Sequence, residues 1–282
     1  MVKVSVVILN FKVKRDSLEC IESVQKSDYK NVKLIVVDNN SEDGLSGAIN
    51  DKSIEFIQND QNLGFTGGNN IGVKKALEQG ADYIFILNPD AVVEEDTISN
   101  LVREAQNYSI DIVGPKVLFA DRKTIWYAGG IFDKKNVLGS HKGVNEKDQG
   151  QYEKSEVTDY VTGAALFVRS EVFKKIGLFD DRFFLYYEDA DFCIRAKRVG
   201  FSIMYIPSAK VYHKNAKSTG LGSSLQDYFI TRNRMLIAYK FLPFRTRFAL
   251  LRESLRNLGS PVRRLAFFDF LMGKFGKGSF LK

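Results

Sequence analysis

Short apolar runs alternate with amphipathic segments along the N-terminal part of the chain. Apolar runs rich in β-branched and aromatic residues predict buried strands, here over residues 3–9, 32–38, 53–58 and 82–87. Apolar positions that recur every three to four residues predict helices, here over residues 16–26, 67–79 and about 94–107. This alternation predicts an α/β fold with a mostly parallel central sheet flanked by helices.

Polar side chains follow three of these strands at their carboxyl ends. Asn10 ends the first strand, Asp38 the second, and Asn88 and Asp90 follow the fourth in the run ILNPDA. Ligands of open α/β sheets bind outside the carboxyl ends of the strands, so we expect these residues to face one crevice. Such a carboxylate can bind a cation or accept from the imide N–H of a pyrimidine. Asx turns and an Asn-Pro-Asp turn explain the same residues without a ligand.

A glycine-rich segment, NLGFTGGNNIG at residues 62–72, opens the helix that follows the third strand. Its spacing is not GxGxxG, and it does not follow the first strand, which disfavours a dinucleotide-binding dehydrogenase. Glycines at this place permit close approach of a phosphate or ribose to a helix N-terminus.

Three acids, Glu188, Asp189 and Asp191, stand together behind the aromatic run FFLYY. Neighbouring like charges and apolar rings both raise the pKa of a carboxyl group, which favours a proton acceptor here. Acids in the first turn of a helix also complement the helix dipole, so a structural role explains the same pattern.

Composition limits the class of protein. The chain has 282 residues, of which 44% are hydrophobic, enough for one large domain with a buried core. Its two cysteines, Cys20 and Cys193, lack metal-site or disulfide spacing and fit a reducing compartment. No apolar run reaches the length of a membrane span, and the first run is too short for a signal peptide. We therefore expect a cytoplasmic protein.

Positive charge is concentrated at the C-terminus. Residues 210–282 contain 15 Lys and Arg against 3 Asp and Glu, a net +12, whereas the remaining 26 basic and 31 acidic residues give −5. Arginines alternate with Phe and Leu at helical spacing, which predicts a basic amphipathic helical tail of the kind that contacts membrane surfaces. An ordinary pair of solvated helices is the alternative. No base-reading motif is present, so we expect no nucleic-acid partner.

Several segments, in this order, resemble the family 2 glycosyltransferases, in particular the rhamnosyltransferase-like branch. They are VSVVILNF, VVDNNSEDG, NLGFTGGNN, LNPDA, VTGAALFVRSEVFKKIGLFDDRFFLYYEDADFCIRAKRVG and VYHKNAKS. The resemblance covers about residues 1–235, including Arg232-Asn233. It implies a GT-A fold with a nucleotide-sugar half over about 1–120 and an acceptor half over about 121–235, followed by the tail at 236–282.

The resemblance also implies a reaction and a set of binding residues. The reaction is inverting transfer from a nucleoside-diphosphate sugar, dTDP-L-rhamnose or otherwise a UDP-sugar, to a hydroxyl of a saccharide or lipid-linked saccharide. The expected nucleotide-sugar-binding residues are Asn10, Asp38, Asn40, Asn62, Gly64, Gly67, Asn70, Asn88 and Asp90.

A divalent cation, Mg²⁺ or Mn²⁺, belongs to this implied chemistry. Residues 88–90 stand where the family has Asp-x-Asp, and His213 stands where a histidine completes the metal shell. Asp90, His213 and two diphosphate oxygens would suit an octahedral cation. Asn88 departs from the family pattern, and the missing charge should weaken metal binding in the absence of nucleotide. A lone histidine such as His213 is otherwise more often structural.

The implied catalytic residues are the acids of the FFLYYEDAD segment. Asp189 is the expected base, with Glu188 and Asp191 in supporting roles. Trp126, Tyr127 and Arg232 are expected on the acceptor side, although core packing explains the two aromatics as well. Two other classes stay open: a nucleotidyltransferase-like or dehydrogenase enzyme, and a non-catalytic sugar- or lipid-binding module, since the first Asp of Asp-x-Asp is missing.

Overall fold

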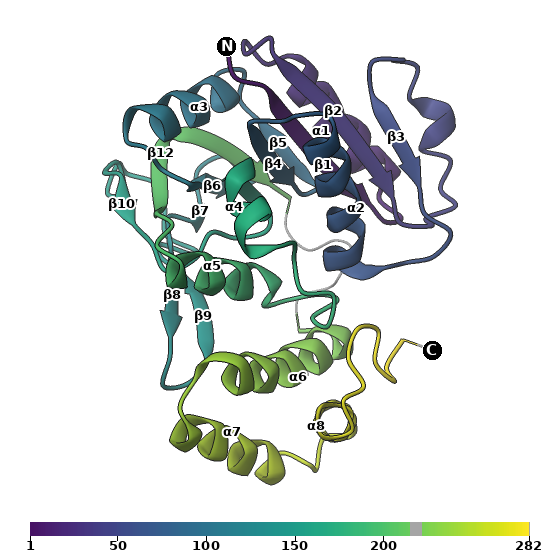
Figure 1. Ribbon diagram of the computed structural model, residues 1–282, viewed down its shortest axis with the longest axis vertical. Coiled ribbons are helices and arrows are strands. Elements are labelled where there is room, and N and C mark those ends of the chain that lie inside the picture. The colour runs from purple at the N-terminus through teal and green to yellow at the C-terminus, as the bar shows by residue number, and fades with distance from the viewer. Residues whose placement is uncertain (215–221, 282) are drawn as a thin grey trace.

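The computed structural model describes residues 1–214 and 222–281 and has a central sheet with helices packed around it (Figure 1). Its strands are β1 (Val4–Asn10), β2 (Val32–Asp38), β3 (Glu55–Gln58), β4 (Tyr83–Leu87), β5 (Ala91–Val93), β6 (Ile112–Phe119), β7 (Ile125–Tyr127), β8 (Gly130–Asp133), β9 (Leu138–His141), β10 (Glu156–Val157), β11 (Ala165–Arg169) and β12 (Ile203–His213). Its helices are α1 (Lys14–Gln25), α2 (Gly64–Glu78), α3 (Thr97–Asn107), α4 (Ser170–Ile176), α5 (Glu188–Arg198), α6 (Ser224–Phe241), α7 (Phe244–Arg256) and α8 (Pro261–Leu271), with a 3₁₀ turn at Ser46–Ala48.

The sheet has the order β10-β12-β6-β11-β4-β1-β2-β3. The four strands predicted from the sequence are β1 to β4, and β1 pairs in parallel with both β2 and β4, as does β2 with β3. Strand β11 departs from the parallel pattern because it runs antiparallel between β4 and β6. It is reached from β6 through strands β7 to β10 rather than through a crossover helix, so the chain re-enters the sheet in the opposite direction.

Helices cover both faces of the sheet, which explains why β1 and β4 are buried along their whole length. Alternate residues of β1 belong to two separate core clusters. Val6 and Ile8 pack in a cluster with side chains of α1 and α3, whereas Val7 packs in one with side chains of α2, α4, α5 and α6. The continuous apolar run of the strand therefore serves two cores.

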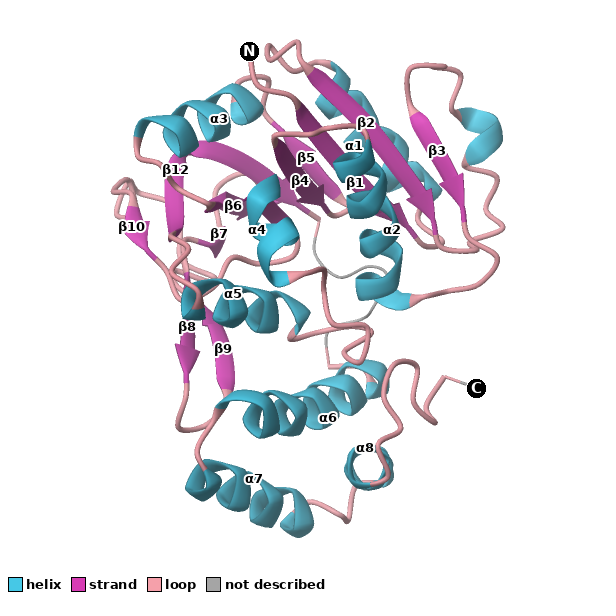
Figure 2. Ribbon diagram, in the orientation of Figure 1, coloured by secondary structure: helices cyan, strands magenta, loops and turns pink. Residues whose placement is uncertain are grey.

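The helices α6, α7 and α8 follow β12 and lie beyond α5, at the end of the molecule remote from β1 to β3 (Figure 2). Met235, Leu236, Ile237 and Ala238 of α6 are buried in the main core. The boundary expected between residues 235 and 236 thus falls inside one continuous, packed helix. Only α7 and α8 have the position of an appended tail.

Candidate active site

The carboxyl ends of β1 and β2 lie side by side, because Asn10 pairs with Asp38 in the parallel register. Nδ2 of Asn10 donates to Oδ1 of Asp38 at 2.6 Å. The other oxygen of Asp38 accepts from the backbone N–H of Ser41 at 2.9 Å and from Nε2 of Gln58 at 2.8 Å. Burial tends to raise the pKa of Asp38, but these hydrogen bonds outweigh it and hold the pKa below its usual range. We call Asn10, Asp38, Ser41 and Gln58 the β1–β2 edge.

Asn39 connects this edge to the start of α2. Its Nδ2 donates to Oδ1 of Asn62 at 2.8 Å and to the carbonyl of Gly64 at 3.1 Å. Its own Oδ1 accepts from the backbone N–H of Leu63 at 3.0 Å. The adjacent Asn40, which the sequence singled out, has a positive φ of 61° and is only partly buried. The buried connector is therefore Asn39.

The glycine-rich start of α2 packs against protein. The first backbone N–H groups of the helix, those of Phe65 and Thr66, donate to the carbonyl of Phe184 at 2.7 and 3.3 Å. Gly64 has a φ of 72°, and a Cβ there would lie 2.5 Å from Phe184. The loop before α5 therefore occupies the place at these two N–H groups, near which the glycines were expected to admit a phosphate or ribose.

Asn70 and Gly67 also face protein. Nδ2 of Asn70 donates to the carbonyl of Phe179 at 3.0 Å and to Oδ1 of Asp181 at 2.7 Å. A Cβ on Gly67 would lie 2.8 Å from Cβ of Leu63. Asn70 therefore ties α2 to the segment that leads to α5, whereas the close neighbour of Gly67 is the N-cap residue of the same helix.

The run after β4 brings Asp90 next to His213. Strand β5 pairs with the end of β12, with Ala91 opposite His213. Oδ1 of Asp90 lies 3.0 Å from Nε2 of His213, and both side chains are buried. Nδ2 of Asn88 lies 3.3 Å from the same nitrogen. Burial tends to raise the pKa of Asp90, but the hydrogen bond and charge of His213 lower it below its usual range.

The spacing of Asp90 and His213 fits two neighbouring ligands of one cation. At metal–ligand distances of about 2.1 Å, adjacent ligands of an octahedral Mg²⁺ lie about 3 Å apart. The 3.0 Å between Oδ1 and Nε2 matches that spacing. No group of three or more His, Cys, Asp or Glu side chains in the described part of the chain is arranged to hold a metal. The last four residues of the motif at 211–218 lie outside the described residues.

Trp126 packs against the imidazole rings of two histidines. Its ring is edge-on to His213 at a centroid distance of 4.6 Å and to His141 at 4.4 Å. Burial lowers the pKa of His141 to about 4, so this ring is neutral at neutral pH. Tyr127 is fully buried, and its hydroxyl donates to the carbonyl of Tyr160 at 2.8 Å. Tyr127 therefore lies in the core.

The first two acids of α5 meet the loop before β11. Oδ2 of Asp189 accepts from the backbone N–H of Gly163 at 3.1 Å, and its Oδ1 accepts from Ala190 at 2.7 Å. Burial raises the pKa of Asp189 despite these bonds. Burial, and then the charge of Asp189, raise the pKa of Glu188 well above its usual range. Oε2 of Glu188 is buried with no hydrogen-bond partner among the described residues.

A short hydrogen-bonded path joins the Asp90 corner to these acids. The backbone N–H of Asn88 donates to the carbonyl of Ala164 at 2.9 Å. The neighbouring residue along the chain is Gly163, whose N–H donates to Asp189. Side chains at the end of β4 and at the start of α5 therefore share one end of the sheet.

Asp191 is turned away from this path. Its side chain is fully buried, and its Oδ2 lies 2.7 Å from Nε of Arg195. Its other oxygen forms an ion pair with Lys240 of α6. Lys240 also pairs with Asp180 at 2.6 Å. Asp191 thus fastens α6 to α5.

Arg232 and Asn233 of α6 hold the loop that precedes the acids. Both are fully buried. The guanidinium of Arg232 donates to the backbone carbonyls of Arg182, Phe183 and Gly276 at 3.1, 3.0 and 2.7 Å. Nδ2 of Asn233 lies within hydrogen-bond distance of the backbone carbonyls at positions 183, 185 and 186, at 3.0, 2.8 and 2.8 Å. The placement of Arg232 on the acceptor side is therefore corrected, since its buried guanidinium bonds backbone carbonyls and Oδ1 of Asn233.

The loop held in this way is strained. Phe184, Tyr186 and Tyr187 have positive φ values of 64°, 67° and 72°, a region that non-glycine residues rarely occupy. Such conformations persist only where surrounding contacts enforce them, and they concentrate at functional sites. The two α6 side chains supply those contacts immediately before Glu188. We call Arg232 and Asn233 the α6 clamp.

Sequence reasoning missed Asn39, Gly163 and Asn233 as parts of the site. Asn39 stands beside a residue that was chosen, and a turn after a strand does not show which of its polar residues points inward. Gly163 precedes β11, whose antiparallel insertion the sequence pattern did not predict. Asn233 follows the chosen Arg232 in the sequence, and the adjacent pair was the signal available.

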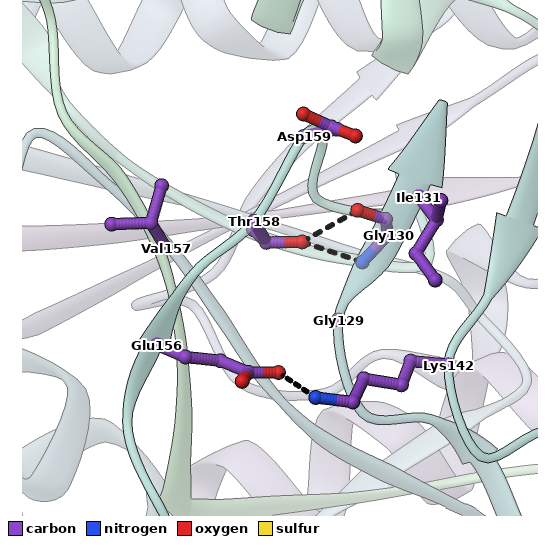
Figure 3. A pocket seen from close by; sticks show the side chains of 8 residues that line it. All are labelled: Gly129, Gly130, Ile131, Lys142, Glu156, Val157, Thr158 and Asp159. Atoms are coloured by element: carbon purple, nitrogen blue, oxygen red, sulfur yellow. Dashed lines mark hydrogen bonds and ion pairs between the residues drawn. The ribbon is translucent and has the colours of Figure 1, made fainter. Parts of the chain in front are cut away.

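A separate cavity of about 260 Å³ lies beside the β8–β9 hairpin (Figure 3). An ion pair between Lys142 and Glu156 crosses it, and Oγ1 of Thr158 bonds both the backbone N–H and the carbonyl of Gly130. None of the predicted site residues lines this cavity.

Comparison with solved structures places the fold in a class. GalNAc-T7 with UDP, GalNAc and Mn²⁺ is similar with a TM-score of 0.65 and 16% identity, over 83% of this chain and 51% of that chain. The mannosyltransferase PcManGT from Pyrobaculum calidifontis, in complex with GDP-Man and Mn²⁺, is similar with a TM-score of 0.60 and 13% identity, over 96% of this chain and 80% of that chain. The protein has the GT-A glycosyltransferase fold.

A family model described as glycosyl transferase family 2 matches residues 5–177. The chain is 30% identical over 221 residues to the dTDP-rhamnosyl transferase RfbF of Shigella flexneri, which covers 75% of this chain and 72% of the relative. It is 26% identical over 224 residues to the N-acetylglucosaminyl-diphospho-decaprenol L-rhamnosyltransferase of Mycobacterium tuberculosis, covering 71% and 72%. This chain belongs to the family 2 glycosyltransferases and is a glycosyltransferase, so the dehydrogenase and binding-module alternatives are set aside.

Proposed function

We propose that the protein is an inverting hexosyltransferase that uses dTDP-L-rhamnose, or otherwise a UDP-sugar. The acceptor is a hydroxyl of a saccharide or lipid-linked saccharide in the synthesis of a cell-surface polysaccharide. The names of the relatives from Shigella and Mycobacterium support rhamnose, and the decaprenol-linked acceptor of the latter supports a lipid-linked one. The observation that carries the proposal is the path from Asn88 through residues 163 and 164 to Asp189.

The β1–β2 edge provides the nucleotide end of this proposal. A carboxylate held ionised by three neighbouring donors suits recognition of an imide N–H, which thymine and uracil share. Asp38 is such a carboxylate. Both proposed sugar donors, dTDP-L-rhamnose and a UDP-sugar, carry that imide. The β1–β2 edge therefore supports a pyrimidine base and does not distinguish thymine from uracil.

Asp90 and His213 would hold a divalent cation, Mg²⁺ or Mn²⁺, together with oxygens of the diphosphate. When bound, the cation neutralises charge that develops on the departing nucleoside diphosphate. Asn88 adds a neutral amide at this corner, 3.3 Å from His213. Because the protein supplies one carboxylate and one imidazole here, we expect tight metal binding only with nucleotide present.

Asp189 is the base in this mechanism. The acceptor oxygen attacks the anomeric carbon while the bond from that carbon to the diphosphate oxygen breaks, and the bonding electron pair leaves with the nucleoside diphosphate. The hydroxyl proton passes to the Asp189 carboxylate. A raised pKa makes Asp189 a stronger proton acceptor than an ordinary aspartate. One displacement from the opposite face inverts the configuration.

Glu188 and the α6 clamp have positioning roles. Glu188 lies beside the base, and burial and the charge of Asp189 raise its pKa, which disfavours a second negative charge there. The clamp holds the strained loop that sets the start of α5. Asp191 supports the same arrangement through its ion pairs with Arg195 and Lys240.

The acceptor is proposed to bind near Trp126. Trp126 is half-buried beside His213, a place where an aromatic ring could stack on a sugar. A lipid-linked acceptor would place the protein at the cytoplasmic face of the membrane as a peripheral protein.

A substitution of Asp189 tests the proposal. The Asp189→Asn protein should keep the rise in melting temperature that dTDP or UDP produces with Mn²⁺, because bound ligand stabilises the folded state. It should lose sugar transfer. GDP serves as the nucleotide control. Normal turnover by the variant, or a thermal shift with GDP alone, would contradict the proposal.

A further inference from the structure

Exposed apolar side chains gather on the last helices. Seven of the fourteen large hydrophobic side chains that are exposed in the described residues lie between positions 239 and 272. Phe244 is 76% exposed and Phe248 57%, and their rings stack on each other at 6.2 Å. Large exposed apolar patches on a protein mark binding surfaces.

These side chains form outward lines along α7 and α8. Phe244, Phe248 and Leu255 are separated by four and seven residues, the spacing of one helix face, and the buried residues of α7 are Leu250 and Ser254. On α8, Phe268 and Leu271 are exposed while Ala266 is buried. Each helix therefore carries exposed apolar side chains away from its buried residues.

Arginines stand between these apolar residues without acidic partners. Four exposed arginines form no ion pair within the described residues: Arg245, Arg252, Arg256 and Arg264. The acids of α7 and α8 do not offset them. Glu253 pairs with Arg234 at 3.0 Å, and Asp269 is fully buried. The outer surface is consequently both apolar and positively charged.

We infer that this surface binds an anionic lipid bilayer. We call it the α7–α8 face, and it consists of Phe244, Phe248, Leu255, Phe268, Leu271 and Met272 with the four arginines. Aromatic and aliphatic side chains that alternate with arginine suit the boundary between lipid headgroups and acyl chains. A second copy of the same face would bring unpaired arginines against arginines, which disfavours a symmetric dimer.

The position of the α7–α8 face in the molecule is consistent with a lipid-linked acceptor. The α7 and α8 helices lie at the end of the molecule beyond α5 and α6, and the arrowheads of β2 and β3 point toward that half (Figure 1). Helices α7 and α8 thus lie toward the end of the sheet at which the carboxyl ends of β2 and β3 lie. The inference rests on the proposed function in one respect, because a lipid-linked acceptor explains why the active site should be near a bilayer. No helix in the described ranges is long and apolar enough to span a membrane.

Sedimentation of the full-length protein with vesicles tests the inference. Wild type should sediment with vesicles of phosphatidylcholine and phosphatidylglycerol and less with phosphatidylcholine alone, and added salt should release it. Arg252→Gln with Arg256→Gln should weaken binding about fivefold per arginine. Phe244→Ser with Phe248→Ser should also release the protein. The matched control is Tyr108→Ser with Val157→Ser, two exposed side chains outside the face, and it should bind as wild type.

Other outcomes overturn the inference. Equal sedimentation of the face variants and the wild type would do so, as would no binding by wild type. Conversion of a dimer to a monomer by the phenylalanine substitutions, seen by analytical ultracentrifugation, would assign the face to a second copy. Transfer to a water-soluble acceptor without vesicles is measured in parallel. Absence of this transfer in the wild type would count against the proposed function. Absence of vesicle binding, with transfer intact, would count only against the α7–α8 face as a membrane-binding surface.

Discussion

Two sets of carboxylates at the same end of the sheet have opposite electrostatic character. Asp38 of the β1–β2 edge is 3% exposed, and Glu188 at the start of α5 is 5% exposed. Burial alone would raise the pKa of both. Three neighbouring donors bond Asp38 and its pKa falls, whereas one oxygen of Glu188 has no partner among the described residues and its pKa rises.

The comparison shows that hydrogen-bond donors decide the charge of a buried acid. A carboxylate bonded by several N–H groups stays ionised and can serve as a fixed acceptor. One that lacks them, or that stands beside another acid, holds its proton more tightly. Pairs of environments that separate pKa values in this way distinguish binding carboxylates from those that exchange protons.

The largest expected effect is on proton transfer at Asp189. Asp189→Asn should lower kcat about 10²- to 10⁴-fold, the usual contribution of a general base. In wild type, kcat/KM should rise with pH through a pKa above that of an ordinary aspartate, because the base acts only when ionised. The pH dependence of kcat/KM, which reports the pKa values of the free enzyme, measures this. An ascending limb below pH of about 4, the ordinary value, would contradict the comparison.

The α6 clamp should have the next largest effect. Asn233→Ala removes the amide that bonds three loop carbonyls, so Asp189 is expected to shift. Misplacement of a reacting group lowers kcat by up to about 100-fold, and KM for the sugar donor should change little. Asn100→Ala is the matched control, since Asn100 also bonds a backbone carbonyl, that of Ser208, but on α3. Equal loss of kcat in both variants would indicate a general structural effect.

The metal corner should show coupling to nucleotide. With dTDP present, Mn²⁺ should raise the melting temperature further, and Asp90→Asn should remove that additional rise. Ligand at one hundred times its Kd adds about 2.7 kcal/mol to the free energy of unfolding, so the effect is measurable by calorimetry. Mn²⁺ alone should have a small effect because Asn88 supplies no charge. A full shift with Mn²⁺ in the absence of nucleotide would argue against diphosphate oxygens as ligands.

The smallest expected effects have opposite signs at the two acids. Asp38 has a lowered pKa, so it stabilises the fold above its unfolded pKa, and this contribution is lost as pH falls through the folded value. Asp38→Asn should therefore destabilise the protein at neutral pH by about 1–3 kcal/mol and less in acid.

Glu188 has a raised pKa, so its ionisation opposes folding as pH rises above about 4. Glu188→Gln should raise the melting temperature at neutral pH and change it little in acid. Melting curves at both pH values compare them, and shifts of the same sign would refute the contrast.

Much of the nucleotide half follows from local pattern. Apolar runs bounded by turn residues predicted β1 to β4, and their alternation with helices predicted the parallel pairs among them. The neighbourhood of Asn10 and Asp38 follows as well, because parallel strands present their carboxyl ends together. These features depend on the short-range periodicity of apolar residues and on the general right-handedness of crossovers between parallel strands. Neither requires knowledge of contacts between distant segments.

Long-range packing decided the rest. The sequence did not show that the carbonyl of Phe184 would accept hydrogen bonds from the start of α2, or that β11 would run antiparallel in the sheet. It also did not show that Arg232 would donate to backbone carbonyls. The predicted boundary between residues 235 and 236 also divided α6, although α6 is one helix whose residues 235–238 are buried in the core. The sequence by itself determined strands β1 to β4 and the polar residues, such as Asp38 and Asp90, at or just after their carboxyl ends. The tertiary structure determined which buried acids are hydrogen-bonded and which lack a partner among the described residues, because hydrogen-bond partners come from segments far apart in the chain.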